Sequence, residues 1–340
     1  MKEAEFIDQS IYISAGKFRR YHGAGWKQLL DIPTILLNFI DFFKFISGTI
    51  NAYFILRRIK PNIIFIKGGY IGVPMGLAAA ARGIKYITHD SDTVPGLANR
   101  IIARWATYHT VGMPKEYYDY PAEKTDYVGV PISDEYRYVD EGQQMKFKHE
   151  IGLDYKNDLV LVTGGGLGAV NLNKIVLEII KPLLEHDSNL VVINIAGKNN
   201  QEELTKKAEE ILQPNLRNRF IIKGFIGDLH KYSGAADLVI SRAGATNLAE
   251  FAAQAKACII VPSPYLVGGH QIKNAKALED SGSVVVVDET LAQKKPELLK
   301  NSILELLGSD KQRKALRDNL HKFAHKESAQ ELAKIILSKA

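Results

Sequence analysis

The sequence predicts an α/β protein built from two parallel-sheet domains of the Rossmann type. Three observations support this class. A length of 340 residues, of which 46% are hydrophobic and 24% charged, suits a globular chain with two cores. Residues 63–88 read as strand, glycine loop, alanine-rich helix and strand, which is a parallel α/β unit. Residues 159–173 and 238–253 each join a buried strand to a helix through a glycine turn.

The first domain starts unusually for a doubly wound domain. Its leader MKEAEFIDQS is polar and acidic, so we expect no secretory signal peptide, and a short strand at Ile11–Ser14 follows it. A helical pattern then covers Ile32–Ile59. Asp41 and Lys44 interrupt the apolar span of about 20 residues that a transmembrane helix needs, so we expect a helix packed on the sheet. An alternative interpretation places Phe43 and its neighbours on a membrane surface.

Two loops of the first domain are expected to leave the same edge of its sheet. The carboxyl ends of parallel strands meet at one edge, so the loop with Gly68 and Gly69 should lie near the loop that starts at His89 and Asp90. The paired glycines would let a substrate approach the backbone, or would serve only a tight turn. A histidine at a strand end, such as His89, can be catalytic or structural.

The stretch SRAGATNLAE, residues 241–250, contains the turn that says most about the function of the chain. It reads as a strand end, a turn at Gly244 and a helix capped by Thr246. The free amides and the positive dipole end of such a helix attract a diphosphate without a metal ion. Glu250, expected on the first turn of this helix, can accept hydrogen bonds from both hydroxyls of a ribose, or can simply complement the helix dipole.

Two further loops are expected to face the same crevice. GGGLGAVNLN, residues 164–173, follows a buried strand, and its successive glycines let backbone amides converge on a phosphate. Its spacing matches neither the dinucleotide fingerprint nor a P-loop. His270, Gln271 and Asn274 follow a later strand. The two amides lie on one helical face and suit either sugar hydroxyls or helix caps.

Composition limits which binding partners and which cellular compartment are plausible for the chain. A formal net charge of +6 and an isoelectric point near 9.0 favour anionic partners, which include nucleic acid, anionic lipid and phosphorylated substrates. We expect no nucleic acid, because no aromatic stacking platform or recognition motif accompanies the charge. The single cysteine, Cys258, excludes an intrachain disulfide and suits core packing in a cytoplasmic protein.

The run SRAGATNLAEFAA, followed by a strand and HQIKNA, resembles the donor half of a known family. These are the glycosyltransferases that add N-acetylglucosamine to undecaprenyl-linked muramyl-pentapeptide in peptidoglycan synthesis, and the resemblance covers nearly the whole chain. It implies the GT-B fold, two Rossmann-like domains facing a cleft. The implied acceptor and membrane side is residues 1–133, with the helix 325–340 packing back on it, and the implied donor domain is residues 134–324.

The resemblance implies a metal-independent, inverting transfer of N-acetylglucosamine from UDP-GlcNAc to the lipid-linked muramyl-peptide, without a cofactor. Amides of the two glycine turns would meet the charge that develops on the leaving diphosphate. The turn GFIGDL, residues 224–229, would hold the uracil, and Glu250 the ribose. The implied substrate-binding residues are Asp92, Gly165, Gly166, Phe225, Ile226, Gly244, Ala245, Thr246, Asn247, Leu248, Ala249, Glu250, His270, Gln271 and Asn274.

The chain departs from the family pattern at several positions. The family's Gly-rich loop with a histidine, which lies between the two substrates and holds its candidate base, is absent from this sequence. His89 and Asp90 are therefore the remaining candidates for a catalytic base. Asp92 stands where the family usually has an amide, and Ser133 where it often has a basic residue. The family commonly has a hydroxyl side chain at the position of Gly166, so contact there would use the backbone alone.

Several functions stay open at this point. The basic charge and the Phe-rich helix would help a peripheral enzyme reach the anionic inner leaflet that carries the acceptor, on the cytoplasmic face of the plasma membrane. A UDP-GlcNAc 2-epimerase or another lipid glycosyltransferase would share the fold. A non-catalytic subunit would bind a UDP-sugar in the same pocket but would not catalyse a reaction. A nicotinamide dehydrogenase is disfavoured by the missing dinucleotide fingerprint.

Overall fold

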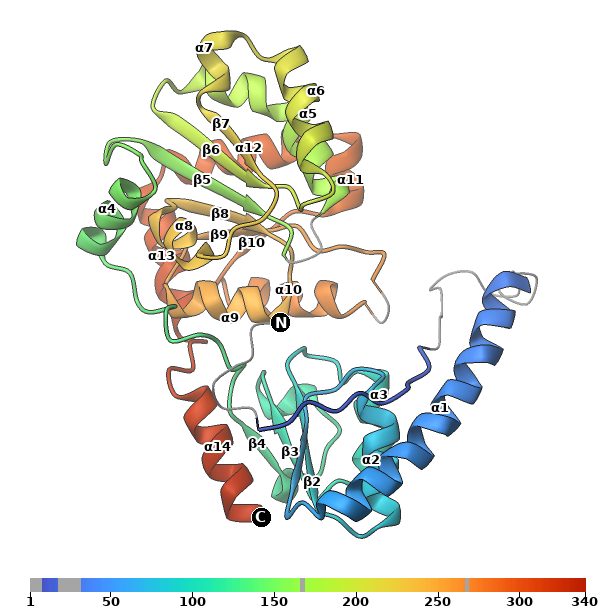
Figure 1. The fold of residues 1–340 in the computed structure, drawn as a ribbon. Coiled ribbons are helices and arrows are strands. Elements are labelled where there is room, and N and C mark those ends of the chain that lie inside the picture. The colour runs from blue at the N-terminus through green and yellow to red at the C-terminus, as the bar shows by residue number, and fades with distance from the viewer. Residues whose placement is uncertain (1–7, 18–31, 166–168, 267–268) are drawn as a thin grey trace. The chain divides into compact units, whose positions relative to one another are not determined.

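The computed structural model describes residues 8–17, 32–165, 169–266 and 269–340 (Figure 1). The chain divides into two compact units. Unit 1 comprises Met1–Val128 together with Gln330–Ala340, and unit 2 comprises Gly129–Ala329. The C-terminal helix thus returns to the first unit, to which it is tied by a hydrogen bond of 3.0 Å from Lys85 Nζ to the Lys339 carbonyl.

Unit 1 contains a four-stranded parallel sheet in the order β1-β2-β3-β4. The strands are β1 (Ile64–Ile66), β2 (Tyr86–Asp90), β3 (Tyr108–Val111) and β4 (Thr125–Tyr127). Every residue of β2 is buried, as expected of a strand covered on both faces. The strand predicted at Ile11–Ser14 is wrong. This segment instead runs against α1 (Ile32–Ile59), where a Cβ on Gly48 would lie only 1.7 Å from the Ser14 carbonyl oxygen.

The helices of unit 1 include the long helix predicted from the sequence. They are α1 (Ile32–Ile59), α2 (Gly72–Ala81), α3 (Leu97–Ile102) and α14 (Ser328–Lys339), with short 3-10 turns at Ala103–Trp105, Lys115–Tyr117 and Ala122–Lys124. Ser328 does not cap α14, although serine favours helix N-caps. It is the first residue of the helix, and its hydroxyl is buried and has no hydrogen-bond partner within the described parts of the chain.

The two halves of α1 differ in environment. Ala52 and Leu56 in its C-terminal half are buried in a core that also contains residues of α2 and of the sheet, so the helix is part of the fold. The N-terminal half exposes most of its apolar side chains, among them Leu36, Phe39 and Phe43. By length and composition alone, Pro33–Ile59 is long and apolar enough to cross a membrane, although the sequence analysis judged its apolar span too interrupted.

Unit 2 contains a six-stranded parallel sheet in the order β10-β9-β8-β5-β6-β7 (Figure 1). The strands are β5 (Asp158–Thr163), β6 (Leu190–Ile195), β7 (Phe220–Lys223), β8 (Leu238–Ser241), β9 (Cys258–Ile260) and β10 (Val285–Val286). The chain builds from β5 outward through β6 to β7, then returns to place β8 on the other side of β5. The order therefore reverses between β5 and β8, which is where α/β proteins of this type bind ligands.

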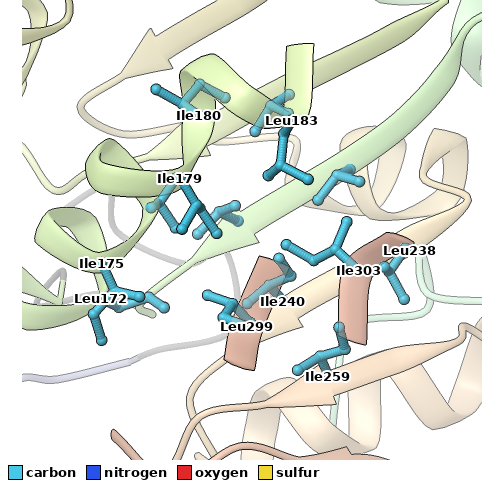
Figure 2. Close-up of a cluster of buried hydrophobic side chains, with 14 of the residues drawn as sticks. Leu172, Ile175, Ile179, Ile180, Leu183, Leu238, Ile240, Ile259, Leu299 and Ile303 are labelled. Atoms are coloured by element: carbon cyan, nitrogen blue, oxygen red, sulfur yellow. The ribbon is translucent and has the colours of Figure 1, made fainter. Parts of the chain in front are cut away.

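Helices cover both faces of this sheet (Figure 1). They are α4 (Glu141–Glu150), α5 (Val170–His186), α6 (Gln201–Ile211), α7 (Pro214–Arg217), α8 (Leu229–Ala235), α9 (Ala245–Ala253), α10 (His270–Asp280), α11 (Glu289–Lys294), α12 (Glu297–Leu307) and α13 (Asp310–His321). Figure 2 shows one core, in which α5 presents Leu172, Ile175 and Ile179 toward strands of the sheet. Their spacing of three and four residues puts them on one side of α5.

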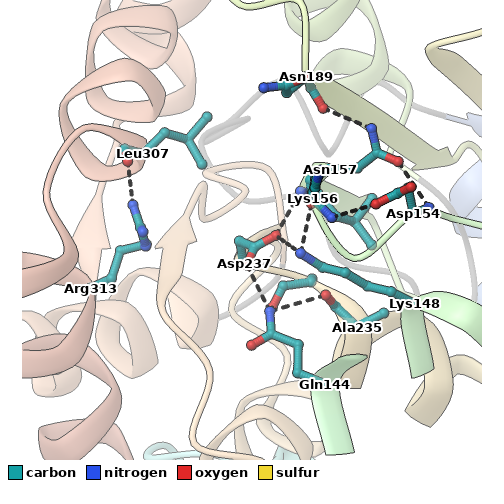
Figure 3. Close-up of polar contacts among 12 residues, drawn as sticks. Gln144, Lys148, Asp154, Lys156, Asn157, Asn189, Ala235, Asp237, Leu307 and Arg313 are labelled. Carbon is teal, nitrogen blue, oxygen red and sulfur yellow. Dashed lines mark hydrogen bonds and ion pairs between the residues drawn. The ribbon is translucent and has the colours of Figure 1, made fainter. Parts of the chain in front are cut away.

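An ionic cluster fixes α4 to the start of β8 (Figure 3). Lys148 Nζ lies 2.8 Å from Asp237 Oδ2, and Gln144 Nε2 donates to Asp237 Oδ1 at 2.7 Å. The Leu159 amide also donates to Asp237, at 2.8 Å. A charged segment such as residues 134–158 usually forms a solvated face, but the Lys148 side chain is buried and paired.

Candidate functional site

The site lies at the carboxyl edge of the unit 2 sheet, where the loops after β5 and β8 meet. Gly165, just after β5, has φ +76°, a conformation that favours glycine. A Cβ there would lie 3.8 Å from Asn247 Oδ1, so this loop lies close to the first turn of α9. The Gly165 amide, assigned to the diphosphate, donates to Thr163 Oγ1 at 3.3 Å. Gly166, the second predicted amide of this loop, lies outside the described residues.

The N-terminus of α9 presents backbone amides at this edge. The Leu248 amide donates to the Gly244 carbonyl at 3.0 Å, and the amides of Ala245, Thr246 and Asn247 precede this first intrahelical bond. Thr246 was predicted to cap the helix, but the capping position is Gly244, and no side chain caps α9 among the described residues. Thr246 is one residue inside the helix and exposed. The uncapped amides suit an anion.

The side chains farther along α9 have different roles. Leu248 buries its side chain in the core beneath the helix, so only its backbone is available to a ligand, and Ala249 is half-buried. Glu250 is on the second turn of α9, not on the first turn as predicted, because the helix begins at Ala245. Burial raises the pKa of its carboxyl to about 7, and a hydrogen bond from Tyr136 opposes this rise. Glu250 thus has a partly buried carboxyl on the second turn of α9.

The helix after β9 carries the remaining predicted sugar contacts. Asn274 is almost fully buried, and its amide nitrogen donates to the Ala243 carbonyl at 3.0 Å, which fixes the turn before α9. Gln271 accepts a hydrogen bond of 2.9 Å from the Ser263 amide and so fixes the loop after β9. His270 is the first residue of α10 and is half-buried. These amides support the edge of the site.

Phe225 and Ile226, predicted to hold a uracil, follow β7 at the same edge of the sheet. The Phe225 side chain is 62% exposed, which leaves ring surface on which a base can stack. Ile226 packs against the core through its side chain, leaving its backbone for hydrogen bonds. Lys198, which the sequence analysis did not single out, places its ammonium 5.0 Å from the centre of the Phe225 ring.

A buried ion pair supports the turn before α9. Arg242 directly follows β8, donates to the Val261 carbonyl at 2.8 Å and pairs with Glu289 of α11. The pair is almost completely buried, and Glu289 Oε2 has no hydrogen-bond partner within the described residues. Arg242 thereby ties together the loops after β8 and β9. This role was not predicted, although Arg242 stands directly after a buried strand in the motif.

Breaking this pair should destabilise unit 2 strongly. The Arg242→Met variant leaves Glu289 as an unpaired buried charge, so we expect a loss of about 3 to 5 kcal/mol in the free energy of unfolding. Urea denaturation followed by circular dichroism measures this loss. Lys276→Met, which breaks an exposed pair with Asp280, is the matched control and should cost less than about 1 kcal/mol. An Arg242→Met variant as stable as the control would contradict this role.

The predicted base candidates of unit 1 are buried at the end of β2. The His89 ring is fully buried, with Nδ1 3.1 Å from Thr110 Oγ1 and Nε2 without a partner in the described chain. Burial, with a smaller contribution from nearby Lys67, lowers the pKa of His89 to about 4. The buried Asp90 accepts a hydrogen bond of 2.8 Å from the Tyr120 hydroxyl, and burial raises its pKa. Burial of both side chains disfavours direct contact with a substrate.

A second buried histidine stabilises the same edge. His109 of β3 stacks on Tyr120 with the ring centres 4.1 Å apart, and its Nδ1 is 2.8 Å from Thr88 Oγ1. Burial lowers the pKa of His109 to about 4. Asp92, predicted to bind substrate, is half-buried in the loop after β2, and its carbonyl accepts a hydrogen bond of 2.8 Å from Tyr118. Aromatic and histidine side chains therefore fill this edge of unit 1.

Both units match models of one protein family. Residues 30–110 match the glycosyltransferase family 28 N-terminal domain. Residues 159–332 match the glycosyltransferase family 28 C-terminal domain, which contains the loops after β5 and β8 and the whole of α9. The chain belongs to glycosyltransferase family 28. Membership makes the chain a glycosyltransferase with the GT-B fold, as the resemblance of its sequence motifs implied.

Relatives within glycosyltransferase family 28 cover nearly the full chain. The UDP-N-acetylglucosamine–N-acetylmuramyl-(pentapeptide) pyrophosphoryl-undecaprenol N-acetylglucosamine transferase of Caldicellulosiruptor saccharolyticus is 33% identical, over 98% of this chain and 85% of that protein. The crystal structure of Acinetobacter baumannii MurG is 25% identical, with a TM-score of 0.67 over 87% of this chain and 79% of that one. A UDP-GlcNAc 2-epimerase from Neisseria meningitidis, bound to UDP-GlcNAc, has a TM-score of 0.64 at 11% identity over 86% and 82%, which shows a shared fold alone.

Proposed function

We propose that this chain transfers N-acetylglucosamine from UDP-GlcNAc to an undecaprenyl-diphosphate-linked muramyl-peptide, with inversion at the anomeric carbon. The full-length similarity to transferases with this printed activity supports the proposal. The structural observation that carries it is the position of the glycine loop after β5 close to the N-terminus of α9, at the reversal of strand order in unit 2. The first amides of α9 have no side-chain cap among the described residues, so they can donate to a diphosphate.

The residues of this edge suit distinct parts of the donor. The amides of Ala245 and Thr246 would stabilise the negative charge that develops on the UDP leaving group. Glu250 would accept hydrogen bonds from the ribose hydroxyls, since a carboxylate can accept several at once. The exposed Phe225 ring would stack on the uracil, and the sugar would lie near the start of α10 at His270. This arrangement uses charge stabilisation by amides rather than by a metal ion.

Transfer also requires a base that takes the proton of the acceptor hydroxyl. His89 and Asp90 remain the candidates that the sequence supplies. The hydrogen bonds of His89 to Thr110 and of Asp90 to Tyr120 also explain both residues as supports of the β2 edge. Catalysis by either residue stays a prediction, which the burial of both side chains disfavours.

Incubation with UDP-GlcNAc in the presence and absence of a detergent-solubilised lipid-linked muramyl-peptide tests the proposal. Nuclear magnetic resonance of the nucleotide pool distinguishes the outcomes. The proposal requires UDP to appear only with the acceptor. An epimerase would instead convert UDP-GlcNAc to its 2-epimer with no acceptor present, and that result would overturn the transferase assignment.

We further propose that the N-terminal half of α1 contacts the inner leaflet that carries the acceptor. Its exposed apolar side chains include Leu36, Phe39 and Phe43, and Lys44 on the same half pairs its ammonium with Asp41 at 3.2 Å. Aromatic and aliphatic side chains bury in the interface of a bilayer, while neighbouring basic groups attract anionic lipid headgroups. The enzyme would then be peripheral, on the cytoplasmic face of the membrane.

Co-sedimentation with vesicles that contain anionic phospholipid tests this membrane contact. We expect the unsubstituted chain to sediment with the vesicles, and a Phe39→Ser, Phe43→Ser double variant to lose most of this binding because it removes buried apolar area. A Tyr155→Ser, Leu291→Ser double variant, which changes exposed apolar residues of unit 2, is the control and should bind like the unsubstituted chain. Equal binding by all three proteins would contradict the contact.

A further inference from the structure

The loops after β6 and β7 are held to each other by hydrogen bonds at the carboxyl edge of the unit 2 sheet. The Ala196 amide, directly after β6, donates to the Lys223 carbonyl at the end of β7 at 2.8 Å. The Ala196 carbonyl accepts hydrogen bonds of 2.9 Å from the side-chain amides of Asn173 on α5 and of Asn200 before α6. The start of each loop is therefore fixed to the neighbouring strand and to α5.

Two glycines bring the backbones of these loops close together. Gly197 has φ +92°, a left-handed conformation that favours glycine. A Cβ on Gly224 would lie 2.5 Å from Gln201 Oε1 and 3.2 Å from the Cα of Lys198, so a side chain there would press on the loop after β6. Lys198 and Phe225 directly follow the two glycines. Their side chains therefore start from adjacent backbone in a fixed arrangement.

The Lys198 side chain reaches the Phe225 ring across this short gap. Its ammonium lies 5.0 Å from the ring centre, within the range of a cation–π interaction. The Phe225 side chain is otherwise largely exposed, and an exposed side chain loses rotational freedom when a ligand packs on it. A cation that already holds the ring removes part of this entropic cost before the ligand arrives. The contact can therefore prepare the ring for a ligand.

We propose that Lys198 is a positioning residue for the base of the donor: its ammonium holds the Phe225 ring in the orientation on which the uracil stacks. This role rests on the proposed function, which places the uracil on Phe225. Lys198 touches no reacting atom and acts through the ring. A lysine that bound the diphosphate directly would act through its own charge, whether or not the ring is present. The two roles therefore predict different responses to removal of the ring.

The Lys198→Met variant tests this role, since it removes the ammonium and keeps an unbranched side chain. Isothermal titration calorimetry with UDP measures the affinity. We expect the affinity for UDP to fall about threefold, because an exposed cation–π contact is lost. Lys198→Arg should restore the affinity, since a guanidinium also stacks on an aromatic face. Lys223→Met is the matched control, because it removes the same charge from the same edge, where the Lys223 ammonium lies 5.6 Å from the centre of a different ring, Tyr232. It should bind UDP like the unsubstituted chain.

A double-mutant cycle separates action through the ring from action on the phosphates. Phe225→Leu should lower the affinity for UDP about tenfold, because stacking of the base is lost. In the Phe225→Leu background, Lys198→Met should cause no further loss. A further threefold loss in that background, an unchanged affinity of Lys198→Met alone, or equal losses in Lys198→Met and Lys223→Met would each overturn the inference. Failure of the unsubstituted chain to bind UDP would instead overturn the donor site, and this role with it.

Discussion

The Glu250→Gln variant should lose at least about a hundredfold in kcat/KM for UDP-GlcNAc. Each hydrogen bond from a ribose hydroxyl to an ionised carboxylate contributes about 1.5 to 3 kcal/mol, and a neutral amide replaces two of them poorly. The variant keeps the shape of the side chain, so α9 should fold normally. Steady-state kinetics of acceptor-dependent UDP release, at saturating acceptor and varied UDP-GlcNAc, measures this loss.

Glu210→Gln is the matched control for this experiment. Glu210 is an exposed residue of α6, away from the loops after β5 and β8, and its substitution should leave kcat/KM within about twofold. Circular dichroism confirms that both variants are folded. A Glu250→Gln variant with kinetics like those of Glu210→Gln would show that Glu250 does not bind the donor, and the carboxylate would then serve only the packing around α9.

Unit 1 should lose stability steeply as the pH falls from about 6.5 to about 4. His89 and His109 have folded-state pKa values lowered to about 4 by burial, so the unfolded chain binds more protons in this range. Their contribution is fully present above pH 6.5 and is lost on acidification through the folded pKa. A shift of this size corresponds to about 3 kcal/mol for each ring. The raised pKa of Asp90 acts in the opposite direction and offsets part of the loss.

Trp105 belongs to unit 1, so its fluorescence, isolated in a Trp26→Phe background, follows the unfolding of that unit. Urea titrations at several pH values then give its stability as a function of pH. The exposed His149 provides the control, since His149→Asn should leave the pH profile unchanged. A unit 1 stability that stays level across the acidic range would mean that His89 and His109 titrate normally and are not buried as neutral rings.

The strands of the sheets were predictable where apolar runs mark them. Buried strands were predicted at the start of residues 159–173 and of residues 238–253, and β5 and β8 lie there, because β-branched residues in short runs favour buried strands. The strands Thr125–Tyr127 and Val285–Val286 were not predicted. Each has only two or three residues, and Thr125–Tyr127 has an acidic residue at its centre. These strands form because neighbouring strands offer hydrogen bonds, which a local pattern does not contain.

The candidate site was predictable to the extent that it depends on local turn chemistry. Glycines at Gly165 and Gly244 marked the two loops that the structure brings to the strand-order reversal. The ion pair of Arg242 with Glu289 joins residues far apart in the chain, so no local pattern could reveal it. Asn274 is a case in which the local pattern predicts a ligand contact but the side chain instead stabilises the fold. Its position on a helical face suits a sugar ligand, but the fold uses its amide nitrogen to hold the Ala243 carbonyl.

The most direct test of the donor site measures the transfer of radiolabelled N-acetylglucosamine from UDP-GlcNAc onto a lipid-linked muramyl-peptide. The assay compares the unsubstituted chain, Glu250→Gln and Glu210→Gln. The proposed function requires label in the extracted lipid with the unsubstituted chain and with Glu210→Gln, and a loss of at least about a hundredfold with Glu250→Gln. Label that appears equally with Glu250→Gln, or no label with the unsubstituted chain, would contradict it.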